Sequence, residues 1–402
     1  MLKLITSIMI ASCFTLSSYA KESTPVKKPH KPEFKFTWKT TFGGSKKEIA
    51  RAVVALKNGD VAVLGTCRSS KRRGHGREDL CVIRVNSKGH TVWSKFFGGK
   101  KRDLATSMTL TNDGNLVAVG YGESFNKNGD FDVYAVKLSP KDGSMIWQRA
   151  YGGDELDHAN GVCATKDGGV MIAGSTESYG KGYQDVYLLK LDSDGRKEWQ
   201  KTYGSKKDDI AYAITPSSDG NFILAGTSDS YAKDNFDFYV TKVSPRGKQI
   251  WAKAYGEDKK DVFRAITATK DGGCVITGET ESYKSKHSDI DVMKLDKNGE
   301  QVWHQLFGFK SIELGRGIAH TPDGGYMVVG TTKSMGHGKY DMYVLELNDA
   351  GHLTWGNLYG GSKKDIAHAV AQTSRGSMVV VGETASFGHG SSDFFMVDLL
   401  KR

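Results

Sequence analysis

Three histidines, each between two glycines, are the residues of this sequence best suited to bind a ligand. They are His75, His337 and His389, and each stands four residues before an aspartate. An imidazole ring can bind a metal ion, exchange a proton near neutral pH or hydrogen-bond to an anion. Two of the three lie near one end of the chain and the third near the other, so joint chemistry requires a fold that brings the ends together.

The tryptophans show a repeat that relates these stretches. All seven recur at intervals of 52 to 55 residues, at Trp38, Trp93, Trp147, Trp199, Trp251, Trp303 and Trp355. Each interval contains short strand-like segments separated by turns such as "SSDGN" and "SPRGKQ". Repeats of about 50 residues with several short strands are typical of β-propellers, in which each small sheet buries its faces against its neighbours. The sequence therefore predicts an all-β fold, a single seven-bladed β-propeller of four-stranded antiparallel blades, over residues 35–402.

The two ends of the repeat array predict how the ring closes. The chain ends at "DFFMVDLLKR", the third strand of the last repeat, and the array begins with an unmatched tryptophan strand, "FKFTWKTTFGG". Joining the N-terminal strand to the three C-terminal strands removes edges that would otherwise aggregate. Repeats six, seven and one then become neighbours, which places the three histidines on consecutive blades.

The first 34 residues are expected to stand apart from the ring. Residues 1–20 contain one lysine, an apolar run and a small-residue cleavage site at Ala20, as a secretory signal peptide does. A lipoprotein signal ending at Cys13 is the alternative. Residues 21–34 form a Pro- and Lys-rich tether. Since no later segment is long and apolar enough to span a bilayer, we expect a periplasmic or secreted protein, soluble or peripherally anchored.

Two stretches carry a resemblance to a known superfamily. In "LDSDGRKEWQKTYG" and "LDKNGEQVWHQLFG" a tryptophan follows a turn glycine by four residues, which resembles the tryptophan motif of quinoprotein-like β-propellers. The C-terminal repeats look like the tandem repeats of secreted bacterial propellers, and the resemblance covers residues 38–402. Quinoprotein dehydrogenases usually have eight blades and a disulfide between adjacent cysteines. This chain has seven repeats and no adjacent cysteines, so no cofactor is expected, and the superfamily also includes non-catalytic scaffolds.

Residues that occur in every repeat are expected to be structural. Each repeat has a carboxylate ten residues after its tryptophan, an aspartate that opens the third strand, and a serine after the second strand. The members are Glu48, Asp103, Asp157, Asp209, Asp261, Glu313 and Asp365; Asp79, Asp132, Asp185, Asp237, Asp289, Asp341 and Asp393; and Ser69, Ser124, Ser178, Ser230, Ser282, Ser334 and Ser386. We assign them to turns and to hydrogen bonds between blades.

Three positions depart from the repeat, and all do so in neighbouring blades. The polar position of the inner strand has Thr, Asn and Tyr in repeats two to four, but elsewhere it has Arg264, Arg316, His368 and Arg51. The residue before the repeated serine is acidic in repeats two to five, but in repeats one, six and seven it is Arg68, Lys333 and Ala385. The three histidines mark the third position. These cationic and imidazole residues are our candidate ligand-binding residues.

The basic loops suggest what such residues would bind. Loops between blades and loops between second and third strands should emerge on one face, and both are basic, as in "GGSKKE" and "SKRRGHGRED". Solubility and ion pairs between blades would explain this charge. Recognition of an anion is the more specific interpretation, because the guanidinium group of arginine can donate paired hydrogen bonds to a phosphate or a carboxylate. The hypothesis is an exported, non-catalytic binding or scaffold propeller for an anionic glycan, a phosphate-bearing ligand or another envelope protein. We expect a monomer with no DNA partner.

An enzyme is the alternative hypothesis, of the quinoprotein-like or carbohydrate-active kind. Its site would lie at the channel mouth, with the inner-strand arginines and His368 as substrate clamps. No Ser-His-Asp order, phosphate-binding glycine loop or zinc spacing stands out, so no catalytic residue is proposed. A metal shared by the three histidines is disfavoured. Equivalent loops on adjacent blades should lie roughly 10 to 13 Å apart, whereas metal–ligand bonds are about 2 Å long.

The cysteines predict one disulfide. Cys67 and Cys81 lie in one hairpin of repeat one, where other repeats have Gly, Ser or Thr at the first position and mainly Tyr or Phe at the second. A paired departure in an exported protein favours a disulfide across this longest loop, and two unrelated buried thiols are the alternative. Cys163 and Cys274 fall at core positions and are expected to be free and buried.

Overall fold

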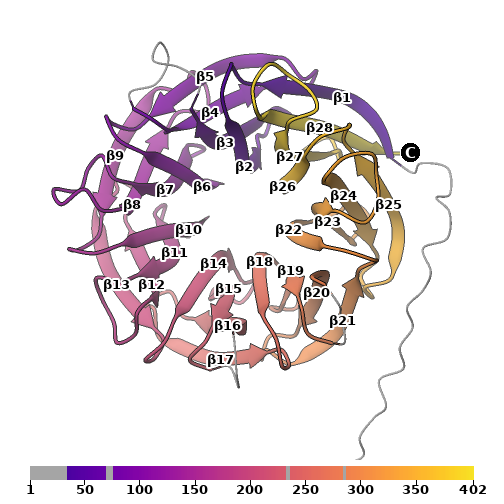
Figure 1. The fold of residues 1–402 in the computed structure, drawn as a ribbon. Coiled ribbons are helices and arrows are strands. Elements are labelled where there is room, and N and C mark those ends of the chain that lie inside the picture. Colours follow the sequence, from indigo (N-terminus) through magenta and orange to yellow (C-terminus); the bar gives the residue numbers. More distant parts are fainter. Residues whose placement is uncertain (1–33, 69–75, 232–235, 284–286) are drawn as a thin grey trace, which may run out of the picture.

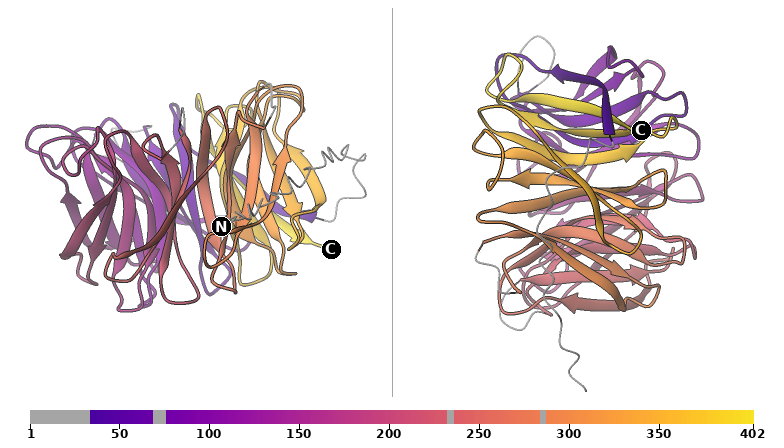
Figure 2. Two further views of the ribbon diagram at one scale, coloured as in Figure 1. Left: turned by 90° about the horizontal axis from the view of Figure 1, so that it is seen from below. Right: turned by 90° about the vertical axis from the view of Figure 1, so that its right-hand side faces the viewer.

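The described part of the chain forms a ring of seven four-stranded antiparallel sheets (Figure 1). The computed structural model describes residues 34–68, 76–231, 236–283 and 287–402. The expected signal peptide, Cys13, the tether up to residue 33 and His75 lie outside these ranges. Seen from the side, the loops project from two opposite ends of the ring (Figure 2). The predicted fold class is confirmed.

The strands occupy equivalent places in each blade, and the blades are numbered from the sheet that contains β2. The innermost strands, nearest the axis in Figure 1, are β2 (Glu48–Ala55), β6 (Asp103–Leu110), β10 (Asp157–Ala164), β14 (Asp209–Pro216), β18 (Asp261–Ala268), β22 (Glu313–His320) and β26 (Asp365–Gln372). The second strands are β3 (Val61–Cys67), β7 (Leu116–Gly122), β11 (Val170–Thr176), β15 (Phe222–Ser228), β19 (Cys274–Thr280), β23 (Tyr326–Thr332) and β27 (Met378–Thr384). The third strands are β4 (Asp79–Val85), β8 (Asp132–Leu138), β12 (Asp185–Leu191), β16 (Asp237–Val243), β20 (Asp289–Leu295), β24 (Asp341–Leu347) and β28 (Asp393–Lys401). The outermost strands are β5 (Thr91–Phe97), β9 (Met145–Tyr151), β13 (Lys197–Tyr203), β17 (Gln249–Tyr255), β21 (Gln301–Phe307), β25 (Leu353–Tyr359) and β1 (Phe34–Phe42).

The ring closes as the sequence predicts. The N-terminal strand β1 is the outermost strand of blade seven and pairs antiparallel with β28, from Phe34 opposite Lys401 to Phe42 opposite Phe394. β1 begins at Phe34, the last residue of the predicted tether, and the Phe34 side chain is buried. Blade seven therefore takes three strands from one end of the chain and one from the other.

The repeated carboxylates are structural, as predicted. The Asp365 carboxylate accepts hydrogen bonds from the backbone N–H of Gly361 at 2.8 Å and from the Ser386 hydroxyl at 2.6 Å. The Asp365 backbone N–H donates to the carbonyl of Tyr340 in the preceding blade at 2.8 Å. The same backbone bond links every adjacent pair of blades, including Glu48 to Ser392 across the closure. These bonds also place the two sets of basic loops on one face.

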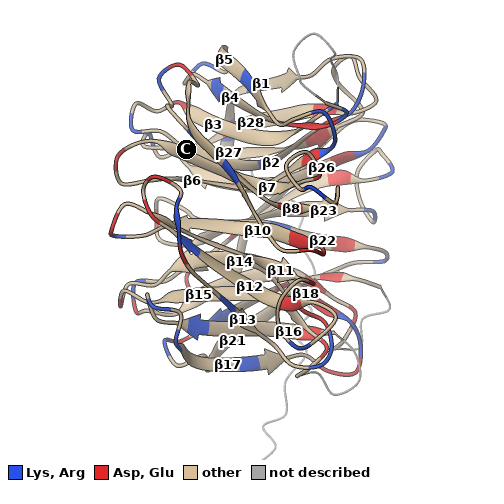
Figure 3. Cartoon of the chain, turned by 90° about the vertical axis from the view of Figure 1, so that its left-hand side faces the viewer, with Lys and Arg blue, Asp and Glu red and all other residues tan. Residues whose placement is uncertain are grey.

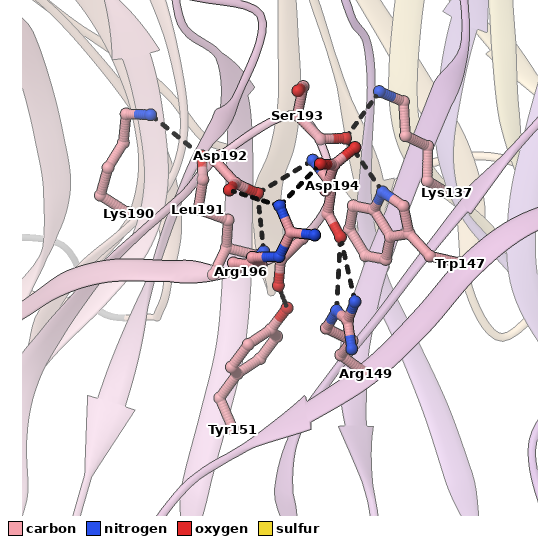
Figure 4. Close-up of polar contacts among 11 residues, drawn as sticks. Lys137, Trp147, Arg149, Tyr151, Lys190, Leu191, Asp192, Ser193, Asp194 and Arg196 are labelled. Carbon is pink, nitrogen blue, oxygen red and sulfur yellow. Dashed lines mark hydrogen bonds and ion pairs between the residues drawn. The ribbon is translucent and has the colours of Figure 1, made fainter.

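The repeated tryptophans join the outer edges of neighbouring blades. The Trp147 indole donates to the Ser193 carbonyl of the next blade at 3.1 Å, and Lys137 donates to the same carbonyl at 3.0 Å (Figure 4). The Trp147 ring lies against Gly195, which has a φ of 75° and leaves no room for a Cβ atom. A turn glycine four residues before six of the seven tryptophans packs in this way against the tryptophan of the preceding blade. At the ring closure Phe34 takes this place and lies against Trp355.

The predicted disulfide is present. Cys67 and Cys81 are bonded with their Cα atoms 5.9 Å apart, and both are buried. In blade three the equivalent positions hold Thr176 and Tyr187, and Tyr187 stacks against Tyr179 at the root of the loop. The disulfide therefore replaces an aromatic contact that fixes this loop in another blade. Cys163 and Cys274 are free and buried, also as predicted.

Replacing both Cys67 and Cys81 by alanine is expected to lower the free energy of unfolding by about 3 kcal/mol, because closing a loop of this length removes entropy from the unfolded chain. Urea unfolding of the oxidised wild-type protein and of the double variant measures the difference. Adding a reductant should destabilise the wild-type protein to a similar extent and leave the variant unchanged. Equal stability of the variant and the oxidised wild-type protein would contradict a structural role.

Candidate functional site

Every innermost strand contains a β-bulge at the same place. In β2 the pairing with β3 shifts between Ala50 and Ala52, so that Arg51 is the extra residue. The same shift occurs once in each of the other six inner strands. A bulge bends its strand and turns the extra side chain away from the regular alternation of the sheet. The residues on either side of the bulge are Ala, Gly or Ser in six of the strands, and Phe263 in β18 is the exception.

The type of bulge residue differs between two parts of the ring: it is arginine or histidine in blades five, six, seven and one, and Thr, Asn or Tyr in blades two to four. Around the axis from blade one they are Arg51, Thr106, Asn160, Tyr212, Arg264, Arg316 and His368. The side chains of Thr106 and Asn160 donate hydrogen bonds to backbone carbonyls of the next inner strand, at 2.8 and 2.9 Å. Four of the predicted site residues therefore occupy one structural position on the consecutive blades five, six, seven and one.

Arg264 is a paired arginine. Its guanidinium Nη2 lies 2.6 Å from Glu279 Oε1, and its Nε donates to the same carboxylate at 3.1 Å. Its guanidinium carbon also lies 4.8 Å from the ring centre of Tyr212 in blade four. Burial would lower the pKa of Arg264, but the Glu279 carboxylate outweighs burial and raises the pKa. The positive charge of Arg264 is thus neutralised within its own blade.

His368 is a neutral histidine beside a second carboxylate. Its Nε2 lies 3.7 Å from Glu383 Oε1, beyond hydrogen-bond length. Burial, with help from Arg51 and Arg316, lowers the pKa of His368 to about 3. Glu383 also accepts hydrogen bonds from Lys364 at 3.1 Å and Ser392 at 2.8 Å. Burial alone would raise the pKa of Glu383, but His368, Lys364 and Ser392 together hold it below its usual range.

Arg51 and Arg316 are left without a carboxylate of their own. Arg51 Nη1 lies 3.4 Å from His368 Nδ1. Among the described residues this is the one hydrogen-bond contact recorded for the Arg51 side chain. The Nε of Arg316 is buried and has no hydrogen-bond partner within the described part of the chain. Burial lowers the pKa of both guanidinium groups. At Arg316 the Glu279 carboxylate acts in the opposite direction, while the positive charges of Arg264 and Arg51 lower the pKa further. Three arginines therefore share two carboxylates near the axis.

The two carboxylates were not predicted from the sequence. Glu279 and Glu383 occupy the next-to-last position of the second strand, where the other blades have Thr66, Tyr121, Ser175, Thr227 and Thr331. They break the repeat in blades five and seven, so the comparison that identified the arginines would also have found them. In blade two the same position holds Tyr121, whose ring centre lies 4.2 Å from that of His158 in blade three, with the two rings tilted by 43°.

The remaining predicted residues lie on the loops of the same face. Arg68, Lys333, His337 and His389 are all exposed, and His75 lies outside the described residues. No recorded hydrogen bond or ion pair connects the side chains of His337 or His389 to the bulge arginines within the described ranges. Groups of three or more metal-ligating side chains are also absent from those ranges.

The glycines around these histidines have a structural role. Gly388 has a φ of 93°, and the N–H groups of His389 and Gly390 both donate to the Asp393 carboxylate at 2.8 Å. A Cβ atom on Gly390 would lie 2.3 Å from the Lys46 carbonyl of the next blade. Blade three builds the same loop from Gly180, Lys181 and Gly182. A blade without a histidine at this position thus has the same Gly-x-Gly loop, so the two glycines are not specific to the histidines.

The face that carries these loops combines buried acids with exposed bases. The inner-strand carboxylates lie at this end of the ring and are buried, while the lysines of the connecting loops, such as Lys46, Lys100, Lys206 and Lys363, are exposed. Figure 3 shows acidic strand ends at this side, with basic segments on the loops beyond them. Because the inner-strand carboxylates are buried, the charged groups that these loops expose to solvent include the lysines named above.

Comparison with known proteins supports the fold alone. No protein-family model and no curated protein sequence matches this chain. A fungal alcohol oxidase of the AA5 family, solved in complex with copper, is similar over 92% of this chain and 76% of its own, with a TM-score of 0.58 and 12% identity. The WD40 domain of Neurospora crassa Pan2 is similar over 87% of this chain and 88% of its own, with a TM-score of 0.51 and 10% identity. The chain is a seven-bladed β-propeller.

Another similar structure is an enzyme with additional parts. Puromycin hydrolase matches 85% of this chain but 51% of its own, with a TM-score of 0.50 and 14% identity. Oxidase, hydrolase and WD40 structures thus share this architecture, so the fold does not select a function. In the part of the chain that the structure describes, no helix has the length and apolar character needed to cross a bilayer.

Proposed function

We propose that the chain is an exported, non-catalytic binding propeller that recognises an anionic ligand through blades five, six, seven and one. The observation that carries this proposal is the buried Nε of Arg316, which has no hydrogen-bond partner among the described residues. Arg51, two blades along the ring, has its recorded contact with His368 at 3.4 Å. A buried N–H donor without an acceptor is costly. A ligand carboxylate, sulfate or phosphate that accepts from both groups would offset that cost.

The surroundings of these two arginines favour binding over chemistry. Burial lowers the pKa of His368 to about 3, and the pKa of Glu383 is held below its usual range, so neither group is poised to exchange a proton near neutral pH. The exposed lysines of the same face would attract anions over a longer range. An anionic glycan, a phosphate-bearing ligand or an acidic envelope protein would fit this arrangement. The disulfide is consistent with an oxidising compartment such as the periplasm or the extracellular space.

The test is calorimetric titration with heparin-derived oligosaccharides and with polygalacturonate oligomers, as sulfated and carboxylated probes, at several salt concentrations. The wild-type protein is expected to bind at least one probe in a salt-sensitive manner. Replacing Arg51 and Arg316 by alanine should weaken binding about tenfold or more, since each loses a charge-assisted contact.

A matched control removes two arginines from the opposite face. Arg196 and Arg246 lie in turns between third and fourth strands and are exposed. Their double alanine variant has the same net charge as the Arg51 and Arg316 variant. If both double variants bound the probes equally weakly, the loss of affinity would follow from net charge alone. That result would contradict the proposed site. Absence of binding by the wild-type protein to both probes would also count against it.

A further inference from the structure

A second anion site is indicated away from the axis, between blades one and two. A cavity of about 370 Å³ opens there, lined by Arg68, Arg77, Glu78, Arg102 and Glu123. Three arginines thus converge on one hollow from two blades. The cavity contains none of the bulge residues, so it is separate from the site proposed above.

The backbone around this cavity is fixed. The N–H of Arg77 donates to the carbonyl of Lys101 at 3.2 Å, and the N–H of Asp103 donates to the carbonyl of Glu78 at 2.8 Å. Arg68 directly follows Cys67, and Arg77 lies within the loop that the Cys67–Cys81 disulfide closes. The disulfide therefore holds the two arginines of blade one against the connector that carries Arg102.

The charges within the cavity are unevenly matched. Arg102 forms an ion pair with Glu123 and lies 4.9 Å from the ring centre of Phe131. No ion pair is recorded for Arg68 or Arg77 within the described residues, and both are exposed to solvent. Two guanidinium groups with no ion pair recorded in the described ranges therefore line the cavity together with a third that is already oriented. The carboxylates of Glu78 and Glu123 add acceptors but no donors.

We propose that this cavity binds a sugar phosphate. A phosphate ester has oxygens directed to several sides, and these can accept from Arg68, Arg77 and Arg102 together, whereas a planar carboxylate is matched by one arginine fork. The hydroxyl groups of a sugar are the natural donors for Glu78 and Glu123. A cavity of this size is within the range of pockets that hold small ligands. The proposal extends anion recognition to a second site on the same face, and it does not depend on Arg51 or Arg316.

The direct test titrates the oxidised protein with glucose 6-phosphate, glucose and inorganic phosphate. Glucose 6-phosphate is expected to bind at least tenfold more tightly than either of the other two. Replacing Arg68 and Arg77 by alanine should weaken this binding about tenfold or more, while the matched Arg196 and Arg246 double variant should bind as the wild type does. Equal affinity for inorganic phosphate would overturn the sugar part of the proposal, and undiminished binding by the Arg68 and Arg77 variant would overturn the site.

A local measurement separates this site from the axial one. Hydrogen exchange with glucose 6-phosphate present is expected to slow in residues 76–85 and 100–104 and to stay unchanged in residues 313–320. Protection only in residues 313–320, lost in the Arg51 and Arg316 variant, would support the axial site and reject this one. Reduction of the disulfide should weaken glucose 6-phosphate binding several-fold, because Arg68 and Arg77 lose their fixed positions. Unchanged affinity after complete reduction would contradict the role given to the disulfide.

Discussion

A chain that lacks β1 is expected not to form a stable monomeric ring. Without β1 the strand β28 becomes an open edge, and such edges pair with other chains. Phe34 loses its contact with Trp355 at 4.8 Å between ring centres, and Phe42 loses its contact with Phe394 at 5.7 Å. The truncated protein, starting at residue 43, should be largely aggregated in size-exclusion chromatography and should show no cooperative thermal transition.

A circular permutant provides the matched control for this truncation. Phe34 pairs with Lys401, so a short turn can join the C-terminus to residue 34 and place residues 34–42 after β28 as a continuous fourth strand. This permutant, starting at residue 43, contains the same strands and should unfold cooperatively as a monomer. If the truncated chain proved as stable as the permutant, the pairing of β1 with β28 would not be needed to close the ring.

The fold was predictable because the same pattern of residues recurs in all seven repeats. Seven tryptophans set the register, and the structure shows the backbone N–H of every inner-strand carboxylate residue bonded to the preceding blade. The six glycines that stand four residues before a tryptophan each lie against the tryptophan of the preceding blade. The disulfide was predictable for the opposite reason, because Cys67 and Cys81 depart from the repeat together in one hairpin. In both cases the signal lies in a comparison between repeats that the sequence itself provides.

The partners of the site residues were harder to predict. Which side chain faces Arg264 depends on the pairing of β18 with β19 and on a bulge that shifts the register between Phe263 and Ala265. Sequence comparison therefore identified the arginine but not Glu279, which neutralises it. The same limit applies to His337 and His389, because their loops are held by backbone contacts that leave the imidazole rings exposed.

Replacing Arg316 by methionine is expected to make the protein more stable, by about 1 to 2 kcal/mol. The Nε of Arg316 is buried without a partner in the described structure, so methionine removes an uncompensated polar group and keeps much of the side-chain volume. Replacing Arg264 by methionine should have the opposite effect, a loss of roughly 2 kcal/mol, because Glu279 would keep its charge and lose its partner. Urea unfolding of the two variants measures both changes under the same conditions.

The opposite signs would separate a structural arginine from one retained for ligand binding. If the bulge arginines served only to connect blades, both substitutions would destabilise the ring. A gain in stability at Arg316 together with weaker binding of the anionic probes is the pattern of a site that sacrifices stability for function. Replacing Glu279 by methionine as well should recover most of the stability lost at Arg264, since the buried charge then disappears. Destabilisation by the Arg316 substitution would instead assign that residue to the scaffold, and the anion site would have to be sought among the loop arginines.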